Sequence, residues 1–493
     1  MKIIFGDKLP FYLVAIIVLC WIANPQAWIA DDSYFYLVIA RNVAQFGSQT
    51  FSGIMPTNGV HPLWTWALSA WAILLNNISP DWLLIPQFAV ILSSVCVAAA
   101  AFYYVKLISE LNLPKESAVL PLLFTGFFGV LGSECHISLL TLSLLCWRAI
   151  KANQAPDFKN LFILGLVSSS AVLARLDNIF SVISILLLFP LFNYKHRIGI
   201  LILPLIVPSF LLLLYFISNE IYFDGLMPVS GWMKSSFPVV SLQGFESGPN
   251  PMFEGVPIIW GWLPLIIVAF SVFFAEGNTR LLLTALLLGV FTKNIYIALF
   301  TRSHTGWYWY STLDIFSLSL ALPLLFSKAN ALNLFRRGMQ CLAFLALVAI
   351  CTKAVTWSLP KTHGTSRGLS LVMNNTSPGD TILVSDWPGY IAFFAADRHI
   401  FAADLLTSNR RWYNEMIKHG NALDFIRETC EKIGAPLTHL LWNGNRWLVI
   451  SDDGRMVVYN DPRQYPKERE IGRWVLPFLP LEKLDKAEIW SLK

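Results

Sequence analysis

The chain has 493 residues, of which 55% are hydrophobic and only 14% are charged, with a formal net charge of +5 and a mean hydropathy of +0.56. A soluble globular protein carries about 25% charged residues, so this composition excludes one large soluble enzyme, a coiled coil and a disordered chain. The small, dispersed net charge also argues against nucleic acid as a partner.

The charged residues are distributed unevenly along the chain. Residues 1–359 contain 19 Lys/Arg and 15 Asp/Glu, about 9% of the positions, whereas residues 360–493 contain 17 and 16, about 25%. The second value is that of an ordinary soluble domain. We therefore predict a polytopic α-helical membrane domain over residues 1–359, followed by a soluble domain over residues 360–493.

Eleven apolar segments of the first region are candidates for membrane-spanning helices, each of which needs about 20 residues to cross a bilayer. They are roughly 9–26, 82–105, 117–132, 136–150, 160–174, 177–192, 198–218, 256–275, 281–300, 306–326 and 338–358. With the N-terminus inside, 13 of the 19 basic residues before residue 360 lie on one side. The positive-inside rule assigns that side to the cytoplasm.

The segment 62–78 is also apolar, but counting it as a span would remove this charge bias. We therefore predict a Trp-rich helix that lies in the outer interface. Eleven spans place the loops 27–81 and 219–255, and the soluble domain, on the non-cytoplasmic side. The first span is expected to be an uncleaved anchor, although PQA at 25–27 resembles a weak signal-peptide cleavage site.

The soluble domain has the pattern of a mixed α/β fold. Residues 381–387 and 399–404 are predicted to be strands on either side of a small helix, residues 411–433 have helical periodicity, and residues 438–442 form a further strand. RWLVI and MVVYN flank an Asp-Asp-Gly turn as a hairpin. The domain has no phosphate-binding glycine loop and no nucleophile elbow, and the seven cysteines of the chain show no metal or disulfide spacing.

Asp31 and Asp32 directly follow the first span and open a helix. One interpretation is that they cap this helix and interact with its dipole. A single carboxylate would be enough for that purpose. Adjacent carboxylates at an apolar boundary also suit acid–base chemistry, in which one accepts a proton from an attacking hydroxyl while the other orients that hydroxyl or binds a cation.

Further polar residues gather at the predicted outer ends of the helices, where ionisable groups are costly and are functional candidates. They are Asn58, His61, Glu134, Arg175, Asp177, Asp224, Lys234, Arg302 and His304. Simpler interpretations exist: Arg175 and Asp177 could pair with nearby charges, Lys234 could be an ordinary loop lysine, and the aromatic run 307–310 could be an interfacial belt. Taken together, cations suit a phosphate leaving group, and aromatic rings suit a sugar.

These motifs, in this order, resemble the GT-C superfamily of membrane glycosyltransferases. The similarity is to the bacterial branch related to protein O-mannosyltransferases, aminoarabinose transferases and arabinofuranosyltransferases. The motifs that carry it are Asp31-Asp32 with Tyr36 and Arg41, TNG-x-HPLW at Thr57–Trp64, G-x-E at Gly132–Glu134, R-x-D at Arg175–Asp177, the stretch Tyr222–Lys234, WYW at Trp307–Trp309 and AADLLTSN at Ala402–Asn409.

The resemblance implies transfer of a sugar from a polyprenyl-phosphate donor to a hydroxyl of a glycan, lipid or protein acceptor, by one inverting displacement on the non-cytoplasmic face. It implies an integral protein of the bacterial inner (plasma) membrane, in contact with membrane lipids. By analogy Asp31 is the base and Asp32 its partner, and these two would hold a divalent cation such as Mg or Mn if one is needed. The donor phosphate is assigned to Lys234, Arg175 and Arg302, and supporting or substrate contacts to Tyr36, Arg41, Asn58, His61, Glu134, Asp177, Tyr222, Trp307 and Tyr308.

Three alternatives stay open at this point. A transporter or flippase of lipid-linked saccharides would fit the prolines within apolar stretches, Pro204, Pro208 and Pro264, but the sequence lacks the repeated halves of many transporters. A non-catalytic scaffold of the same architecture is the second alternative. A polymerase or ligase that moves whole lipid-linked glycans is the third.

Overall fold

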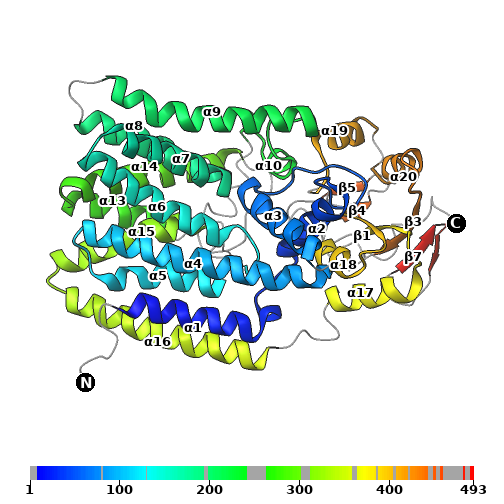
Figure 1. Ribbon diagram of the computed structural model, residues 1–493, viewed down its shortest axis with the longest axis horizontal. Helices are drawn as coiled ribbons and strands as arrows, with labels where there is room; N and C mark the ends of the chain where they lie inside the picture. The colour runs from blue at the N-terminus through cyan, green and yellow to red at the C-terminus, as the bar shows by residue number, and fades with distance from the viewer. Residues whose placement is uncertain are drawn as a thin grey trace.

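A bundle of long helices with a small sheet at one end makes up the computed structural model (Figure 1). The structure describes residues 8–78, 81–128, 130–193, 198–240, 262–300, 311–357, 364–384, 387–402, 407–419, 422–441, 448–450, 456–458, 481–483 and 489–492. The helix α1 begins at the end of the bundle that is farthest from the sheet (Figure 1).

Each of the eleven predicted spans coincides with a helical segment. These are α1 (Leu9–Ala23), α4 (Ile85–Glu110), α5 (Val119–Leu123) with the π-helical turn η5 (Phe124–Phe128), α6 (Cys135–Gln154), α7 (Phe158–Ala174), α8 (Ile179–Asn193), α9 (Ile198–Phe223), α13 (Leu263–Phe274), α14 (Gly277–Phe300), α15 (Thr312–Lys328) and α16 (Leu332–Thr356). Among the described residues, α4, α6, α9, α14 and α16 are long and apolar enough to cross a membrane on their own. These are the helices of an integral membrane protein.

The prolines that favoured a transporter do not interrupt the helices in which they lie. Pro204 and Pro208 are inside α9, which continues through both, and Pro264 is the second residue of α13. A proline in a membrane helix is tolerated because neighbouring helices and local adjustments satisfy the freed backbone groups. Broken helices, which are typical of many transporter sites, are therefore not found at these three positions.

Three helices lie at the same end of the bundle as the sheet (Figure 1): α2 (Asp31–Phe46), α3 (Pro62–Ile78) and α10 (Val229–Lys234). The helix predicted over 62–78 is confirmed as α3. It packs against α2 at the end of the bundle, a position that fits the predicted interfacial helix.

The C-terminal region contains the predicted mixture of helices and strands. Its elements are α17 (Gly364–Asn375), β1 (Thr381–Val384), α18 (Pro388–Phe394), β2 (His399–Ala402), α19 (Arg410–His419), α20 (Ala422–Lys432), β3 (Leu437–Leu441), β4 (Leu448–Ile450), β5 (Met456–Val458), β6 (Leu481–Lys483) and β7 (Ile489–Leu492). The larger sheet has the order β2-β1-β3-β7-β6. β1 pairs in parallel with β2 and β3, while β7 is antiparallel to both of its neighbours. The antiparallel pairing of β4 with β5 is confirmed, and the predicted turn between them lies outside the described residues.

Two large hydrophobic cores are found among the described residues. The first lies within the helical bundle. The second combines residues of α2 and α3, such as Leu37 and Trp64, with residues of β1 and α18, such as Ile382 and Phe393. Burial of apolar area is the main source of stability, so the segment 31–78 and the C-terminal region stabilise one another.

Candidate active site

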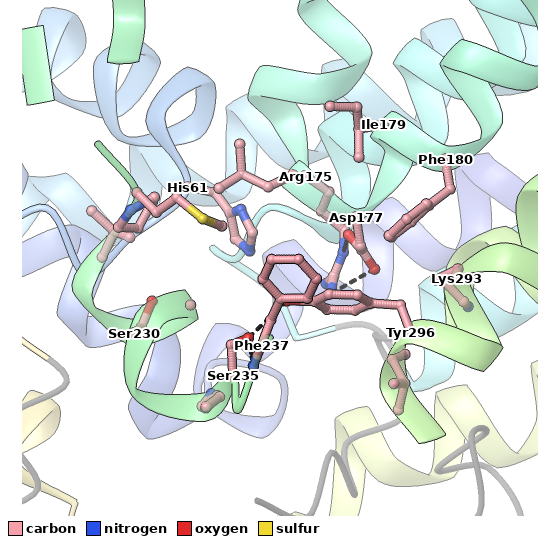
Figure 2. Close-up of a pocket in the computed structure, with 17 residues that line it drawn as sticks. His61, Arg175, Asp177, Ile179, Phe180, Ser230, Ser235, Phe237, Lys293 and Tyr296 are labelled. Carbon is pink, nitrogen blue, oxygen red and sulfur yellow. Dashed lines mark hydrogen bonds and ion pairs between the residues drawn. The ribbon is translucent and has the colours of Figure 1, made fainter. Parts of the chain in front are cut away.

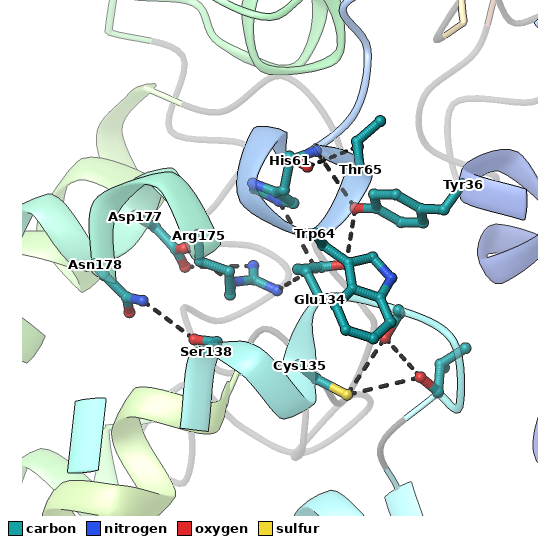
Figure 3. A network of polar contacts seen from close by, with 12 residues as sticks. Tyr36, His61, Trp64, Thr65, Glu134, Cys135, Ser138, Arg175, Asp177 and Asn178 are labelled. Carbon is teal, nitrogen blue, oxygen red and sulfur yellow. Dashed lines mark hydrogen bonds and ion pairs between the residues drawn. The ribbon is translucent and has the colours of Figure 1, made fainter. Parts of the chain in front are cut away.

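A buried polar network lies where α2, α3, α6 and α7 meet (Figure 3). The Tyr36 hydroxyl donates to Oε2 of Glu134 at 2.8 Å, and Nη1 of Arg175 donates to Oε1 of the same carboxylate at 2.8 Å. Arg175 also donates through Nε to Oδ1 of Asp177 at 2.9 Å. Nε2 of His61 is 3.7 Å from Glu134 Oε1. Tyr36, His61 and Arg175 thus surround the Glu134 carboxylate, and Asp177 accepts a hydrogen bond from Arg175. All five are site residues predicted from the sequence.

Local backbone features place these side chains. Gly132 has a φ of +86°, which favours glycine, and its carbonyl accepts from the indole of Trp64 at 2.6 Å. This turn sets Glu134 immediately before α6. Arg175 ends α7 in an extended conformation, and the short helical turn after it returns Asp177 to its guanidinium. The G-x-E and R-x-D spacings of the sequence are explained by these two turns.

The network holds its charges in fixed states at neutral pH. Burial opposes ionisation of Glu134, but the neighbouring His61 ring, the guanidinium of Arg175 and the Tyr36 hydroxyl keep the pKa of this carboxyl below its usual value. Burial lowers the pKa of His61 and raises that of Tyr36 well above its usual range. Glu134 is therefore ionised while His61 and Tyr36 are neutral, and the network forms a preorganised polar wall.

A cavity of about 410 Å³ adjoins this wall (Figure 2). It is lined by Val60, His61, Arg175, Leu176, Asp177, Ile179, Phe180, Met227, Pro228, Ser230, Gly231, Lys234, Ser235, Phe237, Lys293, Tyr296 and Ile297. Most of this lining is apolar, and the cationic side chains of Arg175, Lys234 and Lys293 stand around it. Such a cavity suits a ligand with an apolar body and an anionic group.

The helix that carries Lys234 is fastened on two sides. Oδ1 of Asn58 accepts from the amide of Val229 at 3.1 Å, and Nδ2 of Asn58 donates to the carbonyl of Met227 at 3.4 Å. The Ser235 hydroxyl is 2.9 Å from that of Tyr296 on α14. Asn58 therefore supports the site by holding the start of α10 in place.

Sequence reasoning missed one buried ion pair at the cavity. Lys293 on α14 bonds to Asp314 on α15, and both residues are 1% exposed. Nδ2 of Asn294 lies 3.5 Å from the same aspartate. A charged residue inside an apolar span is a functional candidate by default, so Lys293 and Asp314 can be singled out from the sequence. The sequence does not show that these two residues pair.

The structure places several other predicted residues away from this cavity. Asp31 and Asp32 are not among its described lining residues; the Asp31 carboxylate accepts hydrogen bonds from α18. Arg41 is bonded to carbonyl groups of α18, and Tyr222, at 70% exposed, lies near the end of α9. Arg302, His304, Trp307 and Tyr308 lie outside the described residues.

The described residues do not bring together three His, Cys, Asp or Glu side chains in a way that could hold a metal ion. The adjacent carboxylates of Asp31 and Asp32 therefore have no third ligand of these types in the part of the chain that the structure describes.

No protein-family model and no curated protein matches the sequence. The structure is similar to the crystal structure of ArnT from Cupriavidus metallidurans bound to undecaprenyl phosphate. The two chains are 10% identical and superpose with a TM-score of 0.53, over 92% of this chain and 98% of that chain. The chain therefore has the fold of this structure, and the resemblance of its sequence to the GT-C membrane glycosyltransferases implied a fold of this kind.

Proposed function

We propose that the protein is an integral membrane glycosyltransferase that moves a sugar from a polyprenyl-phosphate donor to an acceptor hydroxyl on the non-cytoplasmic face. One observation carries the proposal: on a GT-C fold, an apolar cavity with basic side chains adjoins a buried polar wall. The similar structure, ArnT, is bound to undecaprenyl phosphate. The expected host membrane is the bacterial inner membrane, with the soluble domain on its outer side.

The donor phosphate is assigned to Lys234 and Arg175. Both line the cavity, whose apolar surface suits the first isoprene units of a polyprenyl chain. Glu134 and Asp177 hold the guanidinium of Arg175 in a fixed position beside the cavity, and Lys234 enters it from α10. Arg302, which lies outside the described residues, stays a third candidate.

The reaction is a single displacement with inversion at the anomeric carbon. The acceptor oxygen forms a bond to this carbon while the bond from the carbon to the phosphate oxygen breaks, and the polyprenyl phosphate leaves with the electron pair. The acceptor proton goes to one carboxylate of the pair Asp31 and Asp32. Lys234 stabilises the negative charge that grows on the leaving phosphate. Glu134, Arg175 and Tyr36 hold one another in fixed positions beside the cavity.

The test is release of undecaprenyl phosphate from a radiolabelled pool of undecaprenyl-phosphate-linked sugars, incubated with the purified protein and membrane extract as the source of acceptor. The proposal predicts release that depends on the acceptor fraction. A transporter or flippase would move the donor without cleaving it, and a scaffold would do neither, so intact donor in every reaction contradicts the proposal. Transfer of a long glycan in place of one sugar unit would indicate a polymerase or ligase.

A further inference from the structure

The helix α18 of the C-terminal region is seated directly on α2, the helix that begins with the aspartate pair. Gly389, the second residue of α18, allows the close approach: a Cβ at this position would lie 2.5 Å from the carbonyl oxygen of Asp31 and 3.2 Å from the Phe35 nitrogen. A Cβ does not fit at such distances from backbone atoms, so the contact requires glycine at position 389.

Polar groups of α2 hold both ends of α18. Oδ1 of Asp31 accepts from the amide of Tyr390 at 2.7 Å, and Oδ2 accepts from the amide of Gly389 at 3.2 Å. Ten residues further along α2, Nη1 of Arg41 donates to the carbonyl oxygens of Ala392 at 3.2 Å and Phe393 at 2.9 Å. The anion lies at the amino end and the cation at the carboxyl end, the arrangement in which each satisfies backbone groups that a helix leaves unpaired.

Aromatic packing fills the space between these two ends. The Tyr34 ring lies 5.3 Å from that of Tyr390 and 5.4 Å from that of Phe393. The Arg41 guanidinium is 5.4 Å from the Trp82 ring. Burial lowers the pKa of Arg41 to about 10, so this residue keeps its charge at neutral pH. We call Asp31, Tyr34, Arg41 and their partners on α18 the α2–α18 clamp.

The C-terminal region also touches the helix that carries Lys234. The Arg410 guanidinium lies over the Trp232 ring of α10, 4.0 Å from its centroid. The Thr57 hydroxyl donates to the carbonyl of Ser408 at 2.9 Å, and Nδ2 of Asn409 donates to the carbonyl of Pro56 at 3.2 Å. The C-terminal region therefore contacts both Asp31 of the aspartate pair and the helix that carries Lys234.

The helical period separates the two aspartates. Residues 31, 34, 38 and 41 are three or four positions apart, so they share the face of α2 that meets α18. Asp32 is four positions before Tyr36 and shares a different face, the one on which the Tyr36 hydroxyl reaches Glu134. Both carboxylate oxygens of Asp31 accept amide hydrogen bonds from α18, so this side chain is committed to the contact between the two helices.

We propose that the two aspartates have separate roles: Asp31 is a positioning residue that docks the C-terminal domain through the α2–α18 clamp, and Asp32 is the carboxylate that accepts the acceptor proton. The inference rests on the proposed function, since it divides the work of the same pair. The C-terminal domain then forms part of the active site. It packs on the side of the site that faces away from the bundle.

The test combines two measurements on the purified full-length protein. Turnover is followed as release of undecaprenyl phosphate, and docking as deuterium uptake of the backbone over residues 388–394. Asp32→Asn should lower kcat by at least about 100-fold, the usual contribution of a general base, without changing deuterium uptake. Gly389→Ala should raise uptake and lower kcat by up to about 100-fold, since small misplacements have effects of this size, while KM for the donor changes little.

Three further variants keep the test decisive. Gly338→Ala is the matched control, because a Cβ there meets nothing within 4 Å, and it should change neither measurement. Arg41→Met loosens the far end of the clamp, so it should raise uptake and lower kcat even if Gly389→Ala does not fold. Asp31→Asn should raise uptake along with its loss of turnover.

Two results would overturn the inference. One is an Asp32→Asn variant that keeps wild-type kcat while Asp31→Asn is inactive with unchanged uptake. The other is full turnover in variants whose α18 has become exposed. If the wild-type protein releases no undecaprenyl phosphate, the proposed function fails and the role of Asp32 falls with it, whereas the uptake data still report whether the clamp exists.

Discussion

The two ends of the helical bundle use charged residues differently. At the end far from the sheet, Lys151 and Glu110 form an ion pair at 2.5 Å in which both side chains are about a third exposed. At the end near the sheet, Glu134 and Arg175 form a pair at 2.8 Å with side chains that are 5% and 3% exposed. Charged side chains at the far end are in contact with water, and their positions reflect how the chain is oriented in the membrane. Charged side chains at the end near the sheet are buried, compensate one another and form part of the site.

The largest expected effect is on the buried pair. Glu134→Gln removes one of the two charges that compensate Arg175 and should lower the free energy of unfolding by up to about 3–5 kcal/mol, the usual consequence of breaking a buried pair. Glu110→Gln at the other end should cost no more than about 1 kcal/mol. Thermal unfolding of the two variants in the same detergent measures the difference, and equal losses would contradict the contrast between the ends.

Variants of the Lys293–Asp314 pair test whether Lys293 contributes to ligand binding as well as to the stability of the protein. Lys293→Met alone should destabilise the protein by about 3 kcal/mol or more, because Asp314 is left buried and unpaired. The double variant Lys293→Met/Asp314→Leu should recover most of that stability. If its binding of undecaprenyl phosphate is also normal, Lys293 has no part in the phosphate site.

Lys234→Ala should weaken binding of undecaprenyl phosphate by roughly 10- to 100-fold, since a hydrogen bond to a charged group contributes about 1.5–3 kcal/mol. Stability should change little, because Lys234 is only partly buried. Lys328→Ala, at the exposed end of α15, is the control and should leave affinity unchanged. An equal loss of affinity in both variants would show that general charge, and not the cavity, attracts the lipid.

The smallest expected effect is a change in how the stability of the protein depends on pH. The pKa values of His61 and Glu134 are lower in the folded protein than in the unfolded chain, so the unfolded state binds more protons and acid destabilises the fold. For His61 this loss begins as the pH falls below its ordinary pKa of about 6.5. His61→Gln should therefore show a smaller drop in Tm than the wild type between about pH 7 and pH 5.5. A drop of the same size would mean that the pKa of His61 is the same in the folded and unfolded states.

The sequence predicted the bundle well because its signal is local. Each apolar span needs only its own residues to be recognised, and a segment such as 62–78 could be distinguished by its tryptophans and by charge bias. The strands around α18 were likewise predicted from alternation and turn residues. The division of residues 411–433 into α19 and α20 was not apparent, since both halves follow the same helical period.

The site could be predicted in its members but not in its contacts. Glu134, Arg175 and Asp177 were singled out by their charge in an apolar context, and the structure brings them together with Tyr36 and His61. The position of Arg41 against α18 depends on contacts between residues about 350 positions apart. Periodicity and composition carry no information on such pairs. The sequence resemblance assigned the base to Asp31, whereas the contacts of Asp31 with α18 lead us to propose Asp32 instead.

A structure of the protein with undecaprenyl phosphate bound tests the central claim most directly. The account predicts the phosphate within hydrogen-bond distance of Lys234, in the cavity beside Arg175, with the polyprenyl chain along its apolar side and Asp32 facing the phosphate. A phosphate bound elsewhere on the bundle, with this cavity filled by protein side chains or by an unrelated group, would contradict it.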